Sequence, residues 1–374
     1  MRWSWKITRV AGIDIKIHAT FLLIFAWFGI SYYVTGGTLA AALSGIAFLM
    51  AVFGFVVLHE LGHALTARKF GIKTTDITLL PIGGLARIEK MPDKPIEEFW
   101  VAIAGPAVNF FLAAIFAAAV VLSGNLSTLS LTSLFSLNSG SLLGRLAAVN
   151  LFLGLFNLIP AFPMDGGRIL RALLATQMPY ARATRTAASV GQGIAFLFGL
   201  VGLFTDPMLL FIAFFVYIGA AAEASTVETK SALSGATVSS AMLTEYHSLS
   251  EGDPLSHAIN LIMSGSQAEF PVISGERVVG ILTRKGLIEA IRRLGERAPV
   301  SAAMERSFEA VDTNDPLETV SSKLQSHDYH TLPVVHNDQL VGLITMENIG
   351  EYMMIHSALE SSKQTPPSAW PMPR

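Results

Sequence analysis

The sequence has no cysteine among its 374 residues, so neither a disulfide nor a thiolate metal site is available to it. Charged residues are scarce as well, at 14% of the chain, against about 25% in soluble domains. The formal net charge is −2, which gives no sign of a nucleic-acid partner. Because cysteine is absent, any metal ion must be bound by histidine, aspartate or glutamate.

Hydrophobic residues make up 52% of the chain, and the excess lies in its first 225 residues. A membrane-spanning helix needs about 20 mostly apolar residues. The pattern predicts a polytopic α-helical membrane domain with about six transmembrane helices, followed by a soluble α/β part. The six segments are residues 18–36, 40–67, 99–123, 142–160, 187–204 and 207–222.

Lysine and arginine are unevenly distributed between the loops that join these segments. They precede the first segment and lie between the second and third and between the fourth and fifth, whereas residues 37–39 and 124–141 contain none. Cytoplasmic loops of membrane proteins carry an excess of basic residues. We therefore expect a multi-pass protein of the cell (plasma) membrane, with both termini and the soluble part in the cytoplasm.

The second apolar segment contains an ionisable motif, L-H-E-L-G-H-A at 58–64. His59 and His63 are four residues apart, so they share one helix face, where two imidazoles can bind one zinc ion beside Glu60 as general base. Ionisable residues inside an apolar helix are costly and usually functional. The alternative is a polar helix end at the membrane interface, which explains a stray charge but not this spacing.

A catalytic zinc ion usually has three protein ligands and a water molecule. Asp165 is the candidate for the third ligand, because it lies in N-L-I-P-A-F-P-M-D-G-G-R (157–168). The prolines and glycines of this stretch interrupt the helix where backbone must line a site rather than face lipid. The alternative for Asp165 is an N-cap of the following helix.

HELGH at 59–63, GPAVN at 105–109 and NLIPAFPMDGG at 157–167 together resemble the site-2 protease family of intramembrane zinc metalloproteases. The resemblance covers residues 13–222 and is greatest to the bacterial and archaeal branch that includes a sporulation protease acting on a sigma-factor precursor. It implies hydrolysis of peptide bonds in membrane-spanning or membrane-associated substrates, that is, regulated intramembrane proteolysis. It also implies one zinc ion per chain, bound by the side chains of His59, His63 and Asp165, with Glu60 as the catalytic base.

The resemblance also implies roles for Asn157 and for residues 74–89. Asn157 resembles a family asparagine near the zinc ion, which would hold substrate or stabilise the oxyanion, although helix–helix hydrogen bonding is an equal alternative. Residues 74–89 predict a small hairpin against the membrane, because β-branched residues are bounded by Gly-Gly. In the family such a strand is thought to pair with an extended substrate.

The soluble part contains an internal duplication with a constant offset of 62 residues, for example Asp253-Pro254-Leu255 and Asp315-Pro316-Leu317. The two units resemble cystathionine-β-synthase (CBS) repeats. The predicted domains are therefore a transmembrane metalloprotease domain (1–222), a linker (223–236), two CBS repeats (237–295 and 298–357) and a disordered tail (358–374).

CBS pairs often bind adenine nucleotides through a Thr or Ser and an Asp three residues later. Here Thr283 is followed by Gly286, and Thr345 by Asn348. The loss of both acids argues against a nucleotide cofactor, most of all in the first repeat, and leaves Thr345 and Asn348 as the candidate site. We expect the pair to join two chains in a homodimer or to regulate the membrane domain.

Two other functions fit parts of the sequence. A membrane transporter or channel regulated by CBS repeats would carry several ionisable groups along a path, or inverted repeats with broken helices. The sequence has one such cluster, and its spacing suits zinc. A catalytically inactive membrane scaffold would not need Glu60.

Overall fold

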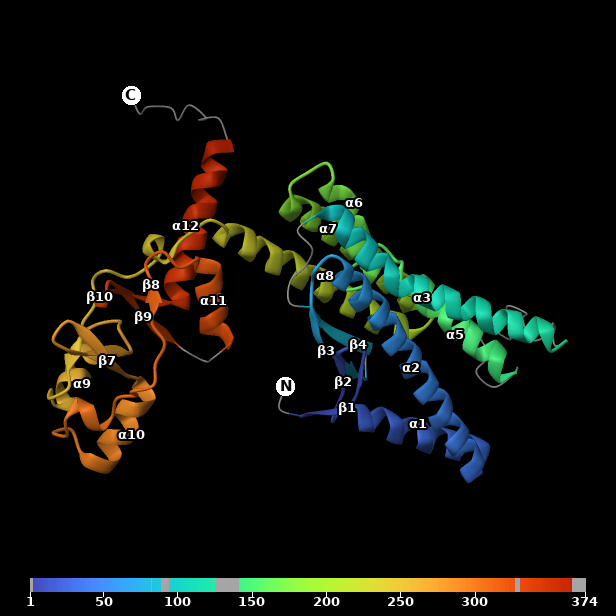
Figure 1. Cartoon of the computed structure of the whole chain (residues 1–374), viewed down its shortest axis with the longest axis horizontal. Coiled ribbons are helices and arrows are strands. Elements are labelled where there is room, and N and C mark those ends of the chain that lie inside the picture. Colours follow the sequence, from blue (N-terminus) through green and yellow to red (C-terminus); the bar gives the residue numbers. More distant parts are fainter. Residues whose placement is uncertain (1–2, 82, 89–93, 125–140, 327–329, 365–374) are drawn as a thin grey trace. The chain divides into compact units, whose positions relative to one another are not determined.

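The structure is a computed structural model of the 374-residue chain, and it describes residues 3–81, 83–88, 94–124, 141–326 and 330–364. The chain divides into two compact units, Met1–Val227 and Glu228–Arg374. The first unit consists mainly of helices and the second of mixed α/β repeats (Figure 1).

The first unit contains seven helices among the described residues, and each of the six predicted apolar segments lies largely within one of them. Four helices are long and apolar enough to cross a membrane in the part of the chain that the structure describes; two others are apolar but only 16 residues long. The count of six spans therefore stays a prediction. The four are α2 (Leu39–Lys69), α3 (Pro95–Leu122), α7 (Tyr180–Phe204) and α8 (Pro207–Leu233); the others are α1 (Phe21–Gly36), α5 (Leu142–Asn157) and the non-spanning α6 (Asp165–Ala175).

A tight turn joins α1 to α2 and fixes where the motif-bearing helix begins. Gly37 adopts the left-handed conformation, with φ at +65°, and its N–H donates to the Tyr33 carbonyl at 2.8 Å. Glycine is favoured there because it has no Cβ to clash. Thr38 then accepts a hydrogen bond from the Ala41 N–H at 3.1 Å and caps α2.

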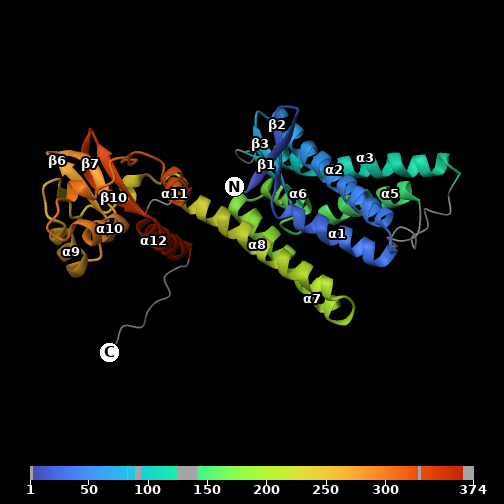
Figure 2. The ribbon, with the colours of Figure 1, turned by 90° about the horizontal axis from the view of Figure 1, so that it is seen from below.

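Helix α3 lies beside α2, α5 and α6 (Figures 1 and 2). Small residues permit this close packing. At Gly62, on the motif helix, an added Cβ would lie 2.8 Å from the Ala104 carbonyl oxygen of α3. The α2–α3 crossing therefore brings the histidine-bearing part of α2 against the backbone of α3.

Helices α7 and α8 form a hairpin at Pro207 (Figure 2). Buried residues of both helices belong to two shared clusters, one with Ala188 and Ala220 and the other with Ala195 and Val216. The two helices pack against the loop that precedes α6, because Phe162 and Ala161 belong to the same clusters.

A four-stranded sheet accompanies the helices, in the order β1-β2-β3-β4. The strands are β1 (Ser4–Val10), β2 (Ile13–His18), β3 (Thr74–Leu80) and β4 (Gly83–Ile88), with β2 and β3 parallel and the other pairs antiparallel. The predicted hairpin at 74–89 is the β3–β4 pair. Residues Ile13 and Ile77 pack against Leu61 and Ala64 of α2, so this sheet lies against the motif helix.

The second unit consists of two repeats with the same element order. The first has β5 (Leu249–Ser250), α9 (Leu255–Ser264), β6 (Phe270–Ser274), β7 (Arg277–Leu282) and α10 (Arg284–Leu294); the second has β8 (Val311–Asp312), α11 (Leu317–Ser326), β9 (Thr331–His336), β10 (Gln339–Thr345) and α12 (Met346–Gln364). Each repeat forms a three-stranded sheet in which its first strand is parallel to its second and the last two are antiparallel.

The two repeats exchange backbone hydrogen bonds reciprocally. Leu243 pairs with Leu343, and Glu305 pairs with Ile281. Adding 62 to Leu243 and Ile281 gives Glu305 and Leu343, so the two exchanges are equivalent under the sequence duplication. A segment of each repeat therefore forms backbone hydrogen bonds with a strand of the other repeat, which explains why the duplication folds as a pair.

The ends of the second unit differ from the predicted boundaries. Helix α8 continues to Leu233, so most of the predicted linker 223–236 is helical. Leu233 is 2% exposed within the core of the second repeat, and this burial accounts for the added helical turns. At the other end α12 reaches Gln364. The rest of the predicted tail lies outside the described residues.

Candidate metal centre

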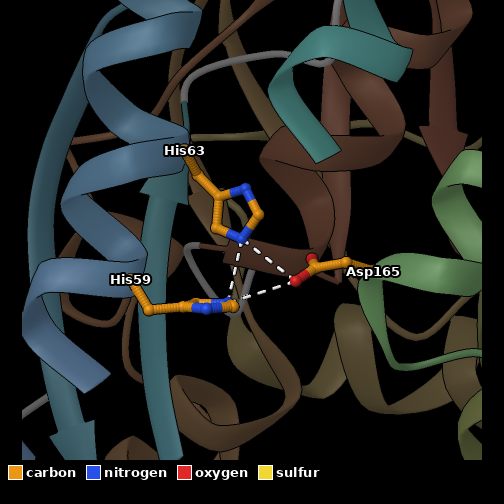
Figure 3. A group of neighbouring side chains, drawn as sticks. All are labelled: His59, His63 and Asp165. Carbon is orange, nitrogen blue, oxygen red and sulfur yellow. Dashed lines mark hydrogen bonds and ion pairs between the residues drawn. The ribbon is translucent and has the colours of Figure 1, made fainter. Parts of the chain in front are cut away.

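Three side chains from two helices converge on one point inside the first unit. His59 and His63 project from α2, and Asp165 projects from the first residue of α6 (Figure 3). The two histidine Nε2 atoms are 3.1 Å apart, and each is 3.1 Å from Asp165 Oδ2. All three residues are buried.

The tautomer of His63 follows from the hydrogen bond of its Nδ1 atom. Nδ1 of His63 lies 2.7 Å from the Val101 carbonyl oxygen of α3, and a carbonyl can only accept, so Nδ1 carries the proton. In the neutral ring, Nε2 then has a lone pair directed at the other two side chains. A backbone carbonyl in this position is the usual device that orients a metal-binding histidine.

This arrangement suits a bound cation. The lone pair of His63 Nε2 lies 3.1 Å from Asp165 Oδ2, and these two atoms repel one another unless a proton or a cation lies between them. Nitrogen and oxygen atoms at about 2.0–2.1 Å from a tetrahedral zinc ion lie roughly 3.3 Å apart. Among the described residues, this is the group of three potential ligands with mutually close donor atoms.

Asp165 is the first residue of α6, and the N-cap position belongs to Met164. Its carboxylate points to the histidines and not along its own helix (Figure 3), so the N-cap alternative does not describe it. The glycines that follow permit the tight entry into α6. A Cβ on Gly166 would lie 2.2 Å from the Ile159 carbonyl oxygen, and one on Gly167 would lie 2.6 Å from the Phe162 nitrogen.

Glu60 is half-buried on α2, next to His59. Its neighbour is β4: a Cβ added to Gly84 would lie 2.7 Å from Glu60 Cγ and 3.0 Å from Glu60 Oε1. Strand β4 is at the edge of its sheet, so one sheet edge runs directly beside this carboxylate.

Gly105 opens the GPAVN motif of α3, and the structure places it directly against the two histidines. A Cβ at this position would lie 2.2 Å from His63 Nε2 and 2.7 Å from His59 Nε2. Only glycine leaves room for the donor atoms. The G-P motif carried the signal, but the sequence does not say which atoms α3 approaches.

Asn157 is the last residue of α5, and its amide nitrogen donates to the Leu153 carbonyl at 3.0 Å. This bond lies within its own helix and does not reach the α2 ligands. The amide nitrogen has a second hydrogen to donate, so a role toward substrate stays a prediction.

Thr345 and Asn348 lie together at the start of α12. The Thr345 N–H donates to Asn348 Oδ1 at 3.2 Å, and the Asn348 N–H donates to Thr345 Oγ1 at 3.2 Å. This reciprocal pair satisfies the first turn of the helix in the manner of a capping box. In the first repeat only the Gly286 N–H bond to Thr283 Oγ1 is made, at 3.1 Å.

A charge cluster around Arg171, in the second half of α6, was not found from the sequence. Arg171 has no exposed surface and pairs with Glu98 of α3 and Glu223 of α8. Arginine is common in the loops next to membrane helices, so nothing in the sequence distinguished Arg171 from an interfacial charge.

Comparisons with known proteins agree with both parts of the fold. The sequence pattern of peptidase family M50 matches residues 47–198, and that of the CBS domain matches residues 238–293 and 300–354. The chain is 31% identical over 366 residues to zinc metalloprotease MJ0392 of Methanocaldococcus jannaschii, covering 97% of this chain and 100% of that protein.

Two more comparisons cover the membrane domain. Stage IV sporulation protein FB of Bacillus subtilis is 32% identical over 161 residues, which are 43% of this chain and 51% of that protein. The solved site-2 protease from Methanocaldococcus jannaschii is 38% identical and covers 59% of this chain and 95% of its own, with a TM-score of 0.43.

Proposed function

This chain belongs to peptidase family M50, the zinc-dependent intramembrane endopeptidases of the site-2 protease type, and we propose that His59, His63 and Asp165 hold its zinc ion while Glu60 serves as its general base. The transporter and scaffold alternatives are not favoured, because the relatives of the whole chain are zinc metalloproteases. Its CBS repeats are a second domain of the same protein.

The observation that carries the proposed ligand set is the triangle of donor atoms 3.1 Å apart. When bound there, zinc supplies Lewis-acid activation of a water molecule and of the scissile carbonyl. Glu60 takes the proton from the attacking water and delivers it to the nitrogen of the leaving amine. The bond that breaks is the peptide C–N bond, and the bond that forms joins the water oxygen to the carbonyl carbon.

The edge of β4 is proposed to hold the substrate. A transmembrane helix must unwind before its backbone is open to attack, and an exposed sheet edge can bind it in extended form. Gly84 places this edge beside Glu60. Asn157 is proposed to donate its free amide hydrogen to the oxyanion; Asn157→Ala should then lower kcat with little effect on KM.

The ligand set is tested by metal content. Purified Asp165→Ala, His59→Ala and His63→Ala proteins should each lose the single zinc ion of the wild type, measured by elemental analysis. Met164→Ala is the control, because Met164 precedes Asp165 and is buried but has no ligand atom for this site. Full zinc content in Asp165→Ala would show that another residue is the third ligand.

Membrane orientation is inferred from the charge distribution of the loops. We propose a multi-pass protein of the cell membrane with both termini and the CBS repeats in the cytoplasm. A reporter fused after residue 230 should be cytoplasmic, and one inserted at residue 130 should be external. The reverse pattern would contradict this orientation and move the CBS repeats to the outer side.

The CBS repeats are proposed to join two chains. Helices α9 and α10 line an apolar cavity of about 210 Å³. Met263 is 82% exposed beside it, and Ile288 is 46% exposed. A second copy of the same helices would cover this surface with apolar residues of its own. Light scattering of the 228–374 fragment should give the mass of a dimer; a strictly monomeric fragment would contradict the proposal.

Adenine nucleotide binding at the pair is proposed to be weak and confined to the second repeat. Asn348 can hydrogen-bond a ribose hydroxyl, whereas Gly286 cannot. Asn348 is, however, engaged with Thr345 by three hydrogen bonds, and a ligand would have to replace those that occupy its side-chain oxygen. Calorimetric titration of the same fragment with ATP, ADP and AMP should show at most one weak site. Tight binding at two sites would contradict this.

A further inference from the structure

We propose that Arg171 is a positioning residue of the metal centre: it fixes helix α6, and with it the Asp165 carboxylate, relative to the two histidines. The inference rests on the proposed ligand set. It concerns a residue six positions beyond Asp165, which is about 9 Å along the helix axis and therefore not in contact with the metal.

The contacts of Arg171 tie α6 to two other helices. Its Nε and Nη2 atoms donate to Glu98 Oε1 of α3 at 2.8 and 2.6 Å. Its Nη1 donates to Glu223 Oε1 of α8. The guanidinium is planar and holds its five N–H groups in a fixed fork, so these bonds determine its direction as well as its distance.

Two aromatic rings enclose the same guanidinium. Its central carbon is 5.0 Å from the ring centroid of Phe162 and 5.0 Å from that of Tyr180. Phe162 belongs to the loop that leads into α6, three residues before Asp165. Tyr180 is the first residue of α7 and donates its hydroxyl to Glu98 Oε1 at 3.5 Å. Arg171 thus fixes the chain on both sides of Asp165. It contacts the preceding loop through Phe162, and it is itself part of the helix that follows.

Glu98 connects this cluster to the histidine side of the centre. It is three residues before Val101 on α3, and the Val101 carbonyl accepts the Nδ1–H of His63. The first two turns of α3 therefore hold His63 through Val101 and α6 through Glu98. The Glu98–Arg171 pair consequently sets the spacing between ligands that come from two different helices.

Buried ion pairs are costly to assemble, because both charges leave water. Arg171 has no exposed surface, and Glu98 is 2% exposed. Apolar residues of the same size would hold helices together at lower cost, so stability alone does not account for the cluster. A role in fixing the direction and position of α6 accounts for the cluster, because metal sites lose affinity when their supporting groups are displaced.

The test compares zinc affinity of the full chain in detergent, by competition with a chelator, for the wild type and Arg171→Lys. Lysine keeps the charge but loses the fork and the ring stacking. We expect zinc affinity to fall by about 10-fold or more, with kcat reduced more than KM is raised. Arg182→Lys is the matched control, since Arg182 is an exposed arginine on α7, and it should match the wild type.

A merely structural role predicts a different result. It would lower the melting temperature of the metal-free protein while leaving the zinc affinity of the folded protein unchanged. Zinc affinity within twofold of the wild type in Arg171→Lys would overturn the proposal. If Arg171→Lys does not fold, Glu98→Gln decides, because it keeps the arginine and removes one charge: lowered zinc affinity supports the positioning role, and unchanged affinity overturns it.

The zinc affinity of Asp165→Ala is measured in the same experiment. It distinguishes a failure of the proposed ligand set from a failure of the positioning role of Arg171. If Asp165→Ala binds zinc as tightly as the wild type, the proposed ligand set is wrong. If Asp165→Ala loses zinc while Arg171→Lys and Glu98→Gln keep wild-type affinity, the ligand set stands and the positioning role of Arg171 is wrong.

Discussion

The membrane unit and the CBS unit place buried polar groups differently. Within the described residues, the buried polar and charged side chains of the membrane unit include two histidines, two aspartates, a glutamate and an arginine, whereas those of the CBS unit are Glu269, Ser321 and Thr331. The CBS cores are almost entirely aliphatic. Burying a charge is expensive in either environment. The membrane unit therefore carries this cost at the candidate metal centre, at the Arg171–Glu98 pair and at Asp76, and the CBS unit uses its interior mainly for packing.

This contrast predicts that equivalent substitutions affect activity in one unit and assembly or stability in the other. The largest difference is expected at the proposed base. Glu60→Gln should lower proteolysis by about 10²–10⁴-fold, the usual contribution of general acid–base catalysis. Zinc content should stay at one per chain, because Glu60 is not a ligand. Cleavage of a co-expressed membrane substrate and elemental analysis are the measurements.

Retained cleavage by purified Glu60→Gln would show that another group moves the proton. Glu289→Gln in the CBS unit is the matched control, since Glu289 is exposed on α10. It should leave proteolysis unchanged.

A second comparison uses glycine. Gly105→Ala places a methyl group 2.2 Å from His63 Nε2, so zinc affinity should fall by about 10-fold or more, as when groups supporting a metal site are displaced. Chelator competition measures it. Gly54→Ala is the control on α2, because nothing lies within 4 Å of its added Cβ; it should bind zinc normally and gain up to ~1 kcal/mol of helix stability.

The glycine comparison has a counterpart in the CBS unit. Gly280→Ala would place its Cβ 2.8 Å from Met304 Sδ, and it should lower the melting temperature of the 228–374 fragment while leaving the zinc content of the full chain unchanged. Equal zinc affinity in Gly105→Ala and wild type would mean that the α3 backbone can move away from the ligands.

The third comparison concerns assembly. Ile288→Gln adds a polar group to the proposed dimer surface and should shift the 228–374 fragment toward monomer in light scattering. Glu289→Gln creates the same residue one position along α10, outside the apolar cavity, and should leave the mass unchanged. A dimer of undiminished stability in Ile288→Gln would place the interface elsewhere.

The smallest effect is expected from pH. Burial raises the pKa of the Glu269 carboxyl above its ordinary value, and a hydrogen bond from Thr331 opposes this only in part. A raised folded-state pKa contributes stability that is present below the unfolded value, about 4.3, and is lost as pH rises through the folded value. Glu269→Gln should therefore stabilise the fragment at pH 7 and flatten its melting temperature between pH 4 and 7.

Asp76 in the membrane unit should behave in the opposite way. Burial alone would raise its pKa, but hydrogen bonds from Lys16 and Thr78 and the charge of Arg87 hold the pKa below its ordinary value. Its stabilising contribution is present above the unfolded value and is lost as pH falls through the folded one. Asp76→Asn should lower the melting temperature of the full chain at pH 7 and have less effect in acid. Parallel pH dependence of the two variants would contradict the assigned shifts.

Several features of the fold could be predicted because they depend on short-range pattern. The apolar segments predicted the helices, and each lies in one. The constant offset of 62 predicted two matching units, and the reciprocal pairing of Leu243 with Leu343 and Glu305 with Ile281 follows the same offset. The boundaries were less predictable: α8 continues through the expected linker because Leu233 is buried in the second repeat, a contact with residues far along the chain.

For the metal centre, the sequence by itself determined the residue types and the local geometry. His59 and His63 share a helix face because they are four positions apart, and Glu60 adjoins them in any helix. The absence of cysteine and the apolar surroundings restricted the possible ligands further. These are properties of one helix, so no tertiary information was needed for them.

Only the tertiary structure decided what completes the site. Asp165 is 106 positions from His59, and its carboxylate reaches the histidines of α2 because α6 packs against α3, which also lies beside α2. The α2–α3 crossing placed Gly105 beside the Nε2 atoms of the two histidines, and the packing of α6 brought Arg171 between Glu98 and Glu223. Contacts between helices far apart in sequence depend on the packing of whole elements, and residue spacing within one helix carries no record of it.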